Sequence, residues 1–412
     1  MIERPFYLEK IQAALKLLPI VVLTGPRQVG KTTLMKMIKT NKKTLFLYGQ
    51  DPETAEIFTK LSLIESYLKI NLSETFNGLL MIDEFQYIYN ISSMLKLLVD
   101  KHPKLQIICS GSSSLDINQK VNESMAGRVR VIPIYSLSFR EYLDFYDIQL
   151  GKKFDKYHDE SQTTLIDKEI SMLQDEYILY GGLPRIALTK KNKEKEELLT
   201  DIYQTYLLRD IRSYVKNQDF VGFNKLLQLI SAQVANMVNV NELSKLTKLN
   251  YNTCQNYIAL LEQMYIIKLI KPYTSNKRKE ITKMQKVYFY DNGMRNRIYG
   301  SFQDINIRTD NGILFENFVF LELLKKVDTC ENIKFYRTKD NMEIDFVLEI
   351  NKRKIPIEAK FSNYEKLMKL RSFYAFENIE KYKTAYLINR NFNMGNENLR
   401  FLPAYFISKI DF

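Results

Sequence analysis

The chain has 412 residues, of which 45% are hydrophobic and 26% charged, and its formal net charge is +12. This length allows about two to four domains with sizeable cores. Its apolar runs fall short of the roughly 18 residues of a membrane-spanning helix, and its N-terminus lacks the pattern of a signal peptide. Three scattered cysteines and two histidines argue against disulfide frameworks, zinc sites and histidine-based triads. The composition predicts a cytoplasmic protein without a membrane partner.

The order of apolar and amphipathic segments predicts an α/β fold whose first part is a parallel sheet. Over the first 150 residues we expect strands at 20–24, 44–48, 79–83, 105–110 and 129–134. Residues 163–216 read as long amphipathic helices, interrupted by Gly-Gly-Leu-Pro at 181–184. Residues 222–291 read as a small helical unit that ends in two strands, at 266–270 and 286–290. After a helix from about 312, we expect strands at 343–349 and 355–360, a helix at 364–376 and a strand at 384–389.

The clearest functional signal is GPRQVGKT at residues 25–32, which fits the pattern G-x-x-x-x-G-K-[ST]. An apolar β-branched run precedes it and an amphipathic helical stretch follows, so backbone N–H groups and a helix N-terminus meet at one point. Lys31 supplies a cation for the β- and γ-phosphates, and Thr32 supplies a hydroxyl for Mg²⁺. We therefore predict a nucleoside triphosphate site, occupied by ATP, formed by Gly25, Pro26, Arg27, Gln28, Val29, Gly30, Lys31, Thr32 and Thr33.

Residues that complete such a site follow the next strands. The strand at 79–83 ends in Asp83, which can hold the Mg²⁺ shell, and Glu84 beside it can orient the attacking water. Ser110 ends another strand at the edge where open α/β sheets bind ligands, and it is either a γ-phosphate sensor or a turn-stabilising serine. Arg128 is either an arginine finger, within the chain or across a subunit interface, or a member of a surface salt bridge.

The middle of the chain has a helix-turn-helix pattern at residues 240–262. We expect Asn241 and Asn252 to cap the two helices. The apolar positions are Leu243, Leu246, Leu249, Tyr257, Leu260 and Leu261, and the second helix would expose the polar groups of Tyr251, Thr253, Gln255 and Asn256. Residues 266–286 carry seven Lys or Arg and one acid, a local net charge of +6, where a wing would lie. Double-stranded DNA contact and a structural lid with a solvated basic loop both fit this pattern.

The C-terminal part has two neighbouring strand patterns that bear carboxylates. Asp345 lies on the first, and Glu358 and Lys360 point to one face of the second. Two converging carboxylates can hold Mg²⁺, and a lysine can steady a hydroxide or the scissile phosphate. From spacing alone, a solvated Glu/Lys hairpin face explains the pattern better.

The ordered set GPRQVGKT, LLMIDEFQ, ICSGSSS, MAGRV and IPIYSLSFREYL resembles the N-terminal domain of a prokaryotic family of AAA-type ATPases. Members of that family carry a C-terminal domain related to the PD-(D/E)XK nucleases. The segments YGGLP (180–184), YLLRDI (206–211) and KVYFYDNGM (286–294) are also similar to the family. The resemblance therefore spans nearly the whole chain.

This resemblance implies an additional-strand, catalytic-glutamate ATPase core, with the acidic pair at Asp83 and Glu84, the sensor in the Ser110 segment and the arginine at Arg128. It also implies that Glu316 is an extra acid behind the metal of a nuclease-like site. Arg209 matches a recurrent family arginine, although a helix-surface salt bridge explains it equally well. The predicted organisation is a P-loop ATPase domain (1–150), a helical lid (151–220), a winged helix-turn-helix module (221–295) and a restriction-endonuclease-like α/β domain (296–412).

The sequence thus predicts an ATPase that uses Mg²⁺ and couples ATP hydrolysis to DNA binding or processing. One alternative is a signalling switch with a protein partner and an inert nuclease-like scaffold. Another is a DNA-binding regulator that hydrolyses ATP slowly and cleaves nothing. Assembly into a homo-oligomer also stays open.

Overall fold

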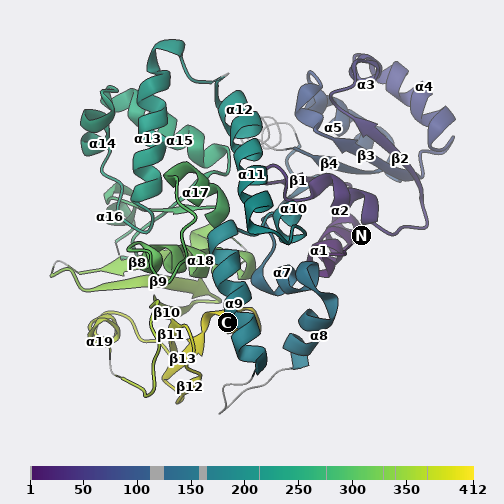
Figure 1. Cartoon of the computed structure of the whole chain (residues 1–412). Helices are drawn as coiled ribbons and strands as arrows, with labels where there is room; N and C mark the ends of the chain where they lie inside the picture. Colours follow the sequence, from purple (N-terminus) through teal and green to yellow (C-terminus); the bar gives the residue numbers. More distant parts are fainter. Residues whose placement is uncertain are drawn as a thin grey trace. The chain divides into compact units, whose positions relative to one another are not determined.

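The computed structural model describes residues 2–111, 125–156, 165–212, 214–274, 276–327, 329–338, 340–368 and 370–412, with side chains omitted at 165–167, 206–210, 277, 279 and 281. The chain folds into two compact units (Figure 1). Unit 1 is Met1–Tyr135 with Gln263–Tyr265, and unit 2 is Ser136–Glu262 with Ile266–Phe412. None of the described helices combines the length and apolar character needed to cross a membrane.

Unit 1 is built on a five-stranded parallel sheet with the order β2-β3-β4-β1-β5. Each predicted strand is confirmed to within one residue at either end. Because β4 lies between β1 and β3, the additional strand that the resemblance implies is also confirmed. The strands are β1 Ile20–Thr24, β2 Lys43–Tyr48, β3 Gly78–Asp83, β4 Gln106–Ser110 and β5 Val129–Pro133.

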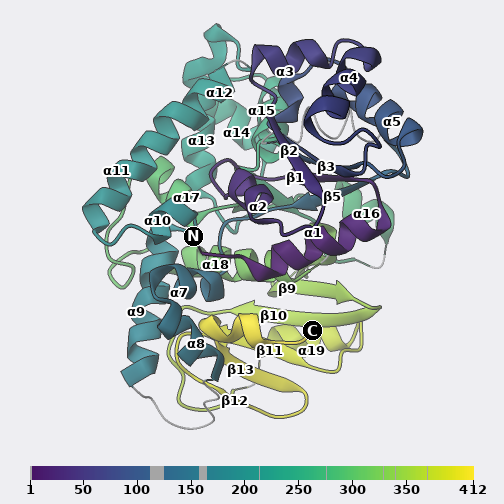
Figure 2. The same ribbon diagram turned by 90° about the vertical axis from the view of Figure 1, so that its right-hand side faces the viewer.

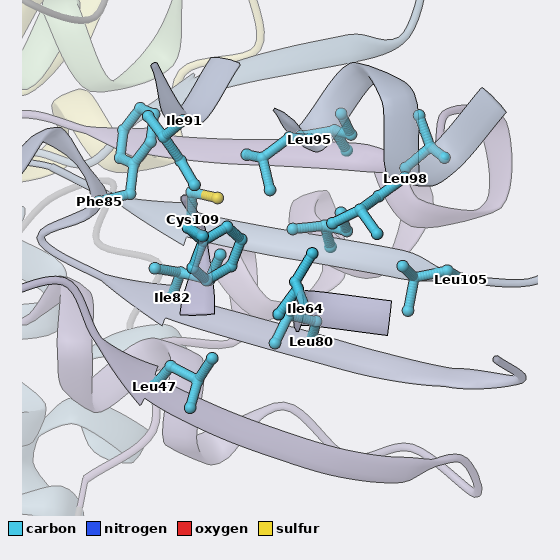
Figure 3. Close-up of a cluster of buried hydrophobic side chains, with 14 of the residues drawn as sticks. Leu47, Ile64, Leu80, Ile82, Phe85, Ile91, Leu95, Leu98, Leu105 and Cys109 are labelled. Atoms are coloured by element: carbon cyan, nitrogen blue, oxygen red, sulfur yellow. The ribbon is translucent and has the colours of Figure 1, made fainter. Parts of the chain in front are cut away.

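Helices cover this sheet, and they are α1 Pro5–Leu17, α2 Lys31–Met37, α3 Pro52–Ile57, α4 Leu61–Asn71 and α5 Ile91–Lys101. Figure 3 shows one face of the sheet, where Leu95 and Leu98 of α5 and Ile64 of α4 pack over Leu80 and Ile82 of β3. Every residue of β1 and β3 is buried, as expected for central strands of a sheet that is covered on both faces. This burial fixes the carboxyl ends of both strands.

Unit 2 begins with helices, of which α7 starts at a capping box formed by Ser138 and Glu141. Gly-Gly-Leu-Pro at 181–184 ends the long helix α9, as predicted. The helices are α7 Phe139–Tyr146, α8 Ile148–Lys156, α9 Leu165–Tyr180, α10 Pro184–Ala187 and α11 Asn192–Ile202, followed by a π-helix at Tyr203–Leu208 and α12 Arg209–Arg212.

Four helices and an antiparallel strand pair follow in the described part of this stretch, in the order α13 Phe220–Ala232, α14 Val240–Thr247, α15 Tyr251–Gln263, β6 Ile267–Ile270, α16 Lys277–Thr282 and β7 Lys286–Phe289. The predicted caps are wrong by two residues. Asn239 accepts a hydrogen bond from the Glu242 N–H, and Asn250 accepts one from the Thr253 N–H, so Asn241 and Asn252 lie inside the first turns. Leu246, expected in the apolar set, is 42% exposed.

The C-terminal part of unit 2 is a six-stranded mixed sheet with the order β12-β13-β11-β10-β9-β8 (Figure 2). The predicted helix at 364–376 starts only at Arg371. Tyr364 instead exchanges hydrogen bonds with Asn391 after β11, which holds this segment in a loop. The elements are α17 Asn292–Tyr299, α18 Asn311–Lys326, β8 Ile333–Arg337, β9 Glu343–Ile350, β10 Arg353–Ala359, α19 Arg371–Glu377, β11 Ala385–Asn389, β12 Met394–Gly395 and β13 Leu399–Pro403.

Two segments singled out in the sequence, 180–184 and 286–294, interlock inside unit 2. The buried Asp291 accepts hydrogen bonds from the N–H groups of Gly182, at 2.9 Å, and Met294, at 3.0 Å. A Cβ atom on Gly181, whose φ is +79°, would lie 2.2 Å from an Asp291 oxygen, and one on Gly293 would lie 2.0 Å from the Tyr180 carbonyl oxygen. The glycines therefore serve close packing. The division of unit 2 into lid, winged-helix and nuclease-like modules stays a prediction.

Candidate functional site

The phosphate loop lies between the carboxyl end of β1 and the first turn of α2, as the sequence predicts. Gly25 and Gly30 have φ values of +129° and +92°. A Cβ atom at Gly25 would lie 2.1 Å from the Ile134 carbonyl oxygen, so only glycine fits there. Helix α2 begins at Lys31, which directs its N-terminus toward the loop.

The Lys31 ammonium is folded back onto this loop. It donates hydrogen bonds to the carbonyl oxygens of Gly25, at 2.9 Å, and Pro26, at 2.7 Å, and the residue is 6% exposed. Burial lowers the pKa of Lys31 to about 8, although the charges of Glu84 and Asp83 oppose that shift. Because its hydrogen bonds go to neutral carbonyls, this cation can still gain by meeting phosphate oxygens.

Asp83 links the loop to the neighbouring strands. Its carboxylate accepts a 2.7 Å hydrogen bond from the Thr32 hydroxyl and another from the Ser110 hydroxyl. The Glu84 N–H donates to the Ser110 hydroxyl at 3.3 Å, and the Gln86 amide donates to the Glu84 carboxylate at 2.5 Å. Thr32 and Asp83 thus present adjacent oxygen donors, the ligand chemistry that Mg²⁺ prefers, so these residues fit the predicted ion.

Arg128 lies at the other end of the sheet. Its carbonyl accepts from the Ile20 N–H, so it stands beside the amino ends of β1 and β5, about five residues or roughly 16 Å from the loop edge. Its guanidinium pairs with Asp100 at 2.5 Å, which raises the pKa of Arg128. The prediction that Arg128 is an arginine finger for the site in its own chain is wrong. Arg128 lies at the amino ends of the parallel strands β1 and β5, whereas the phosphate loop follows the carboxyl end of β1. A role across a subunit interface stays a prediction.

Arg4 was not expected at this site. Its guanidinium donates to the carbonyl oxygens of Val29 in the loop, at 3.2 Å, and Tyr135 after β5, at 2.9 Å. The residue is 3% exposed, and its guanidinium lies 4.5 Å from the centroid of the Tyr7 ring. Arg4 therefore ties the phosphate loop to the end of the sheet. The one feature of the sequence that marks Arg4 is its position directly before Pro5, the proline at which helix α1 begins.

The C-terminal carboxylates lie together in unit 2. Asp345 lies on β9 and Glu358 on β10. Each is adjacent in its strand to a member of the cross-strand pair Phe346–Ile357, on the same side of that pair. Asp345 accepts from the Ala359 N–H at 2.8 Å, and Lys360 pairs with one oxygen of Glu358 at 2.7 Å. The second oxygen of Glu358 is buried and has no hydrogen-bond partner among the described residues. Burial and the charge of Asp345 raise the pKa of Glu358 to about 8.

Lys286 of β7 is a member of this cluster that the sequence analysis assigned to a basic stretch. Its ammonium lies 3.0 Å from Glu316, 3.9 Å from Asp345 and in contact with Glu343, and the residue is 2% exposed. Burial would lower the pKa of Lys286, but these three carboxylates outweigh it and raise that pKa above its ordinary value. The signal in the sequence is a lone lysine that opens an apolar strand, where a charge needs a partner.

The predicted metal ligands Glu316, Asp345 and Glu358 therefore share their space with a cation from the chain itself. Glu316 also accepts a 2.6 Å hydrogen bond from the Tyr288 hydroxyl, and burial raises the pKa of Glu316 to about 7. Across the described parts of the chain, no group of three or more His, Cys, Asp or Glu is placed to hold a metal ion. These residues do not fit the predicted metal centre.

The helix-turn-helix region keeps the expected polar face, since Tyr251, Gln255 and Asn256 of α15 are exposed and Thr253 is half-buried. The basic stretch differs from a free wing. Residues 271–273 exchange main-chain hydrogen bonds with Phe335 of β8, and Tyr273 packs into the core of the C-terminal sheet.

Two of its described cations have carboxylate partners. Lys268 pairs with Glu262, and Lys286 is buried in the cluster, whereas Arg278 and Lys283 are exposed. The side chains of Arg209, Lys277 and Lys279 lie outside the described residues. The local charge of +6 therefore overstates what this stretch presents to a ligand.

Comparison with protein families places three models along the chain. Residues 18–143 match an AAA domain. Residues 172–305 and 311–406 match two domains of unknown function, DUF8612 and DUF4143. The AAA match contains the phosphate loop and the acidic pair.

The chain is also similar to several proteins and to a solved structure over most of its length. An uncharacterised protein of Methanocaldococcus jannaschii is 27% identical, over 81% of this chain and 73% of its own length. One of Mycobacterium tuberculosis is 24% identical, over 87% and 74%. The solved Walker-type ATPase of Pyrococcus abyssi is 14% identical and aligns with a TM-score of 0.51 over 72% of this chain and 96% of that one, which shows a shared fold. The chain therefore contains an AAA-type P-loop ATPase domain, joined to a separate C-terminal sheet domain.

Proposed function

We propose that this protein binds ATP and hydrolyses it to ADP and phosphate, with Mg²⁺, at the phosphate loop of unit 1. The observation that best supports this proposal is the buried Lys31 ammonium. In the hydrogen bonds described, it donates only to the loop carbonyls of Gly25 and Pro26. When a nucleotide enters, its charged oxygens can replace those neutral acceptors and form stronger, charge-assisted hydrogen bonds. Both the AAA match and the shared fold support this proposal.

The surrounding residues divide the remaining work. Thr32 and Asp83 would hold Mg²⁺, which neutralises phosphate charge when bound. Glu84, the residue directly after β3, would accept a hydrogen bond from the attacking water and orient it. Ser110 donates a hydrogen bond to Asp83 and accepts one from the Glu84 main chain, which supports a role for Ser110 as a sensor of the γ-phosphate. Gln86 holds one oxygen of Glu84.

The direct test is phosphate release by the purified full chain with ATP and Mg²⁺, repeated with Asp83→Asn. The variant keeps the shape of the side chain and removes its charge, so release should fall at least about 10²-fold, a scale typical of lost transition-state stabilisation. Asp51→Asn is the matched control, because Asp51 is exposed and only caps α3. Equal turnover by Asp83→Asn and wild type would refute the assignment.

We further propose that ATP hydrolysis is coupled to binding of double-stranded DNA through the α14–α15 region. The support is the exposed polar face of α15 together with Lys245 and Lys248, which are exposed at the end of α14. Phosphate release should rise on addition of duplex DNA. Lys245→Ala/Lys248→Ala should weaken binding and reduce the slope of log affinity against log salt by about one per lost phosphate contact.

The exposed pair Lys381 and Lys383 provides the matched double-alanine control for this DNA test. An unchanged salt slope in the first variant would contradict the DNA proposal.

A second candidate function is a nucleotide-driven switch that acts on a protein partner and uses its C-terminal domain as an inert scaffold. The arrangement of Lys286 among the predicted metal ligands favours it over DNA cleavage. ATP turnover that ignores duplex DNA and changes with a co-purified protein would support the switch. Nicking of plasmid DNA by the wild type with Mn²⁺, lost in Asp345→Asn, would exclude an inert scaffold.

A further inference from the structure

Four carboxylates gather at one place in unit 2, from three different elements. Glu316 comes from α18, Glu343 and Asp345 come from β9, and Glu358 comes from β10. Asp345 and Glu358 are buried, at 6% exposure each. Like charges at such short range are costly in a protein interior unless a cation or protons neutralise them. Something must therefore balance this cluster.

The chain supplies that balance itself. Lys286 reaches in from β7, and its ammonium contacts Glu343, lies 3.0 Å from Glu316 and lies 3.9 Å from Asp345. An ammonium has three N–H donors, so one lysine can serve several carboxylates at once. Two further cations stand at the margin, since Arg337 pairs with Glu343 at 3.2 Å and Lys360 pairs with Glu358 at 2.7 Å.

The carboxylate oxygens are also engaged by neutral donors. The Tyr288 hydroxyl donates to the same Glu316 oxygen that faces Lys286, and the Ala359 N–H donates to Asp345. Among the fully buried side-chain atoms of this cluster, the second oxygen of Glu358 has no hydrogen-bond partner in the described part of the chain. A divalent ion entering this space would have to displace an ammonium that is tethered to β7 and already contacts Glu316 and Glu343, and compete with it for their oxygens.

We propose that Lys286 is the resident cation of this carboxylate cluster and that it excludes a divalent metal from it. The cluster then serves to fasten β7 to the C-terminal sheet through an ion-pair network. It does not activate water for phosphodiester cleavage. This assignment concerns unit 2 alone and does not depend on ATP hydrolysis at the phosphate loop.

The test is to remove the ammonium and look for a metal site in its place. Mn²⁺ binding to the nucleotide-free full chain is measured by electron paramagnetic resonance. Wild type and Asp345→Asn should bind the same amount of Mn²⁺. Lys286→Met, which keeps length and loses charge, should bind one additional Mn²⁺ per chain, because the four carboxylates then face two cations. Adding Asp345→Asn to Lys286→Met should abolish this gain.

Lys268→Met is the matched control, since Lys268 is also a partly buried strand lysine paired with a glutamate, Glu262, but lies outside the cluster. It should gain no Mn²⁺. If Lys286→Met does not fold, Lys286→Met/Glu343→Gln removes one charge of each sign and takes its place in the same measurement. Two results would overturn the proposal: a wild-type Mn²⁺ site that Asp345→Asn removes, or a folded Lys286 variant that gains none.

Discussion

Two buried lysines in this protein have the same charge and different partners. Lys31 donates to main-chain carbonyls, and burial lowers its pKa to about 8. Lys286 lies among carboxylates that outweigh burial and raise its pKa above the ordinary value. A buried ammonium whose hydrogen bonds go to neutral groups is poised to bind an anion, whereas one surrounded by carboxylates is already neutralised and part of the structure. The partners of a buried lysine therefore distinguish a binding site from a structural ion pair.

The largest expected effect is that of removing the Lys31 ammonium. Lys31→Ala should reduce ATP hydrolysis at least about 10³-fold and abolish tight nucleotide binding, because the phosphate charge loses its cation in a buried site. Phosphate release and binding of a fluorescent ATP analogue measure the two effects. Lys36→Ala, an exposed lysine on the same helix α2, is the control and should stay near wild type. Retained nucleotide affinity in Lys31→Ala would contradict the comparison.

Lys286→Met should leave ATP binding intact and lower the free energy of unfolding by about 3 kcal/mol, measured by urea unfolding of the full chain. Breaking a buried ion pair by removing one partner typically costs about 3–5 kcal/mol, and the lower end applies here because the carboxylates can take up protons. Lys268→Met, in an ion pair with side chains 26% and 28% exposed, should cost below about 1 kcal/mol. An equal fall in the free energy of unfolding for the two variants would contradict the assignment of Lys286 as a structural cation of the carboxylate cluster.

Glu84→Gln tests whether charge near Lys31 also acts in catalysis. The variant should bind ATP and hydrolyse it about 10²-fold more slowly, since glutamine cannot accept a proton from the attacking water. Single-turnover phosphate release separates this step from binding. Glu53→Gln, an exposed first-turn glutamate of α3, serves as the control. An unchanged rate of ATP hydrolysis in Glu84→Gln would contradict the catalytic role of Glu84.

Asp291 extends the comparison to a buried acid. Burial raises its pKa to about 6 despite hydrogen bonds from Met294 and Gly182. A raised folded-state pKa contributes stability that is present below the unfolded value of about 3.8 and is lost as the pH rises through about 6. Between pH 4.5 and 6 the unfolding free energy should fall by roughly 1.5 kcal/mol relative to Asp291→Asn, measured in urea at each pH.

Asp310 provides the control of opposite sign for this titration. Burial opposes its ionisation, but Arg308 and Arg295 outweigh burial and lower its pKa to about 2. Its stabilising contribution is therefore lost only as the pH falls toward 2, and Asp310→Asn should show no difference in slope from wild type between pH 4.5 and 6. A flat profile for Asp291 in the same range would contradict its assignment.

The smallest expected effect concerns Arg4, which supports the loop that Lys31 serves. Arg4→Ala should raise the KM for ATP about tenfold, or about 1.4 kcal/mol, with a smaller change in kcat, because it loosens the loop without removing a group that meets phosphate. Arg4→Lys should recover part of the loss by restoring one donor. A fall in kcat alone, or no recovery by lysine, would argue against a positioning role.

All five described strands of unit 1 could be predicted because each is a short apolar run bounded by turn residues. The helix caps could not, since asparagines at 239, 241, 250 and 252 fit a cap equally well, and packing decided which pair serves. The helix expected at 364–376 failed for a similar reason. Its first part bonds to Asn391, about 27 residues away, and no local pattern encodes that contact.

By itself the sequence determined the phosphate loop and the acidic pair, because strand, glycine turn, lysine and helix start are contiguous and their geometry follows from local backbone preferences. The tertiary structure alone decided the rest. Arg4 meets carbonyls 25 and 131 residues away, Lys286 meets its carboxylates 30 to 59 residues away, and strand direction moved Arg128 to the far edge of the sheet. Whether a buried charge binds a ligand or completes the core depends on such distant partners, which only folding brings together.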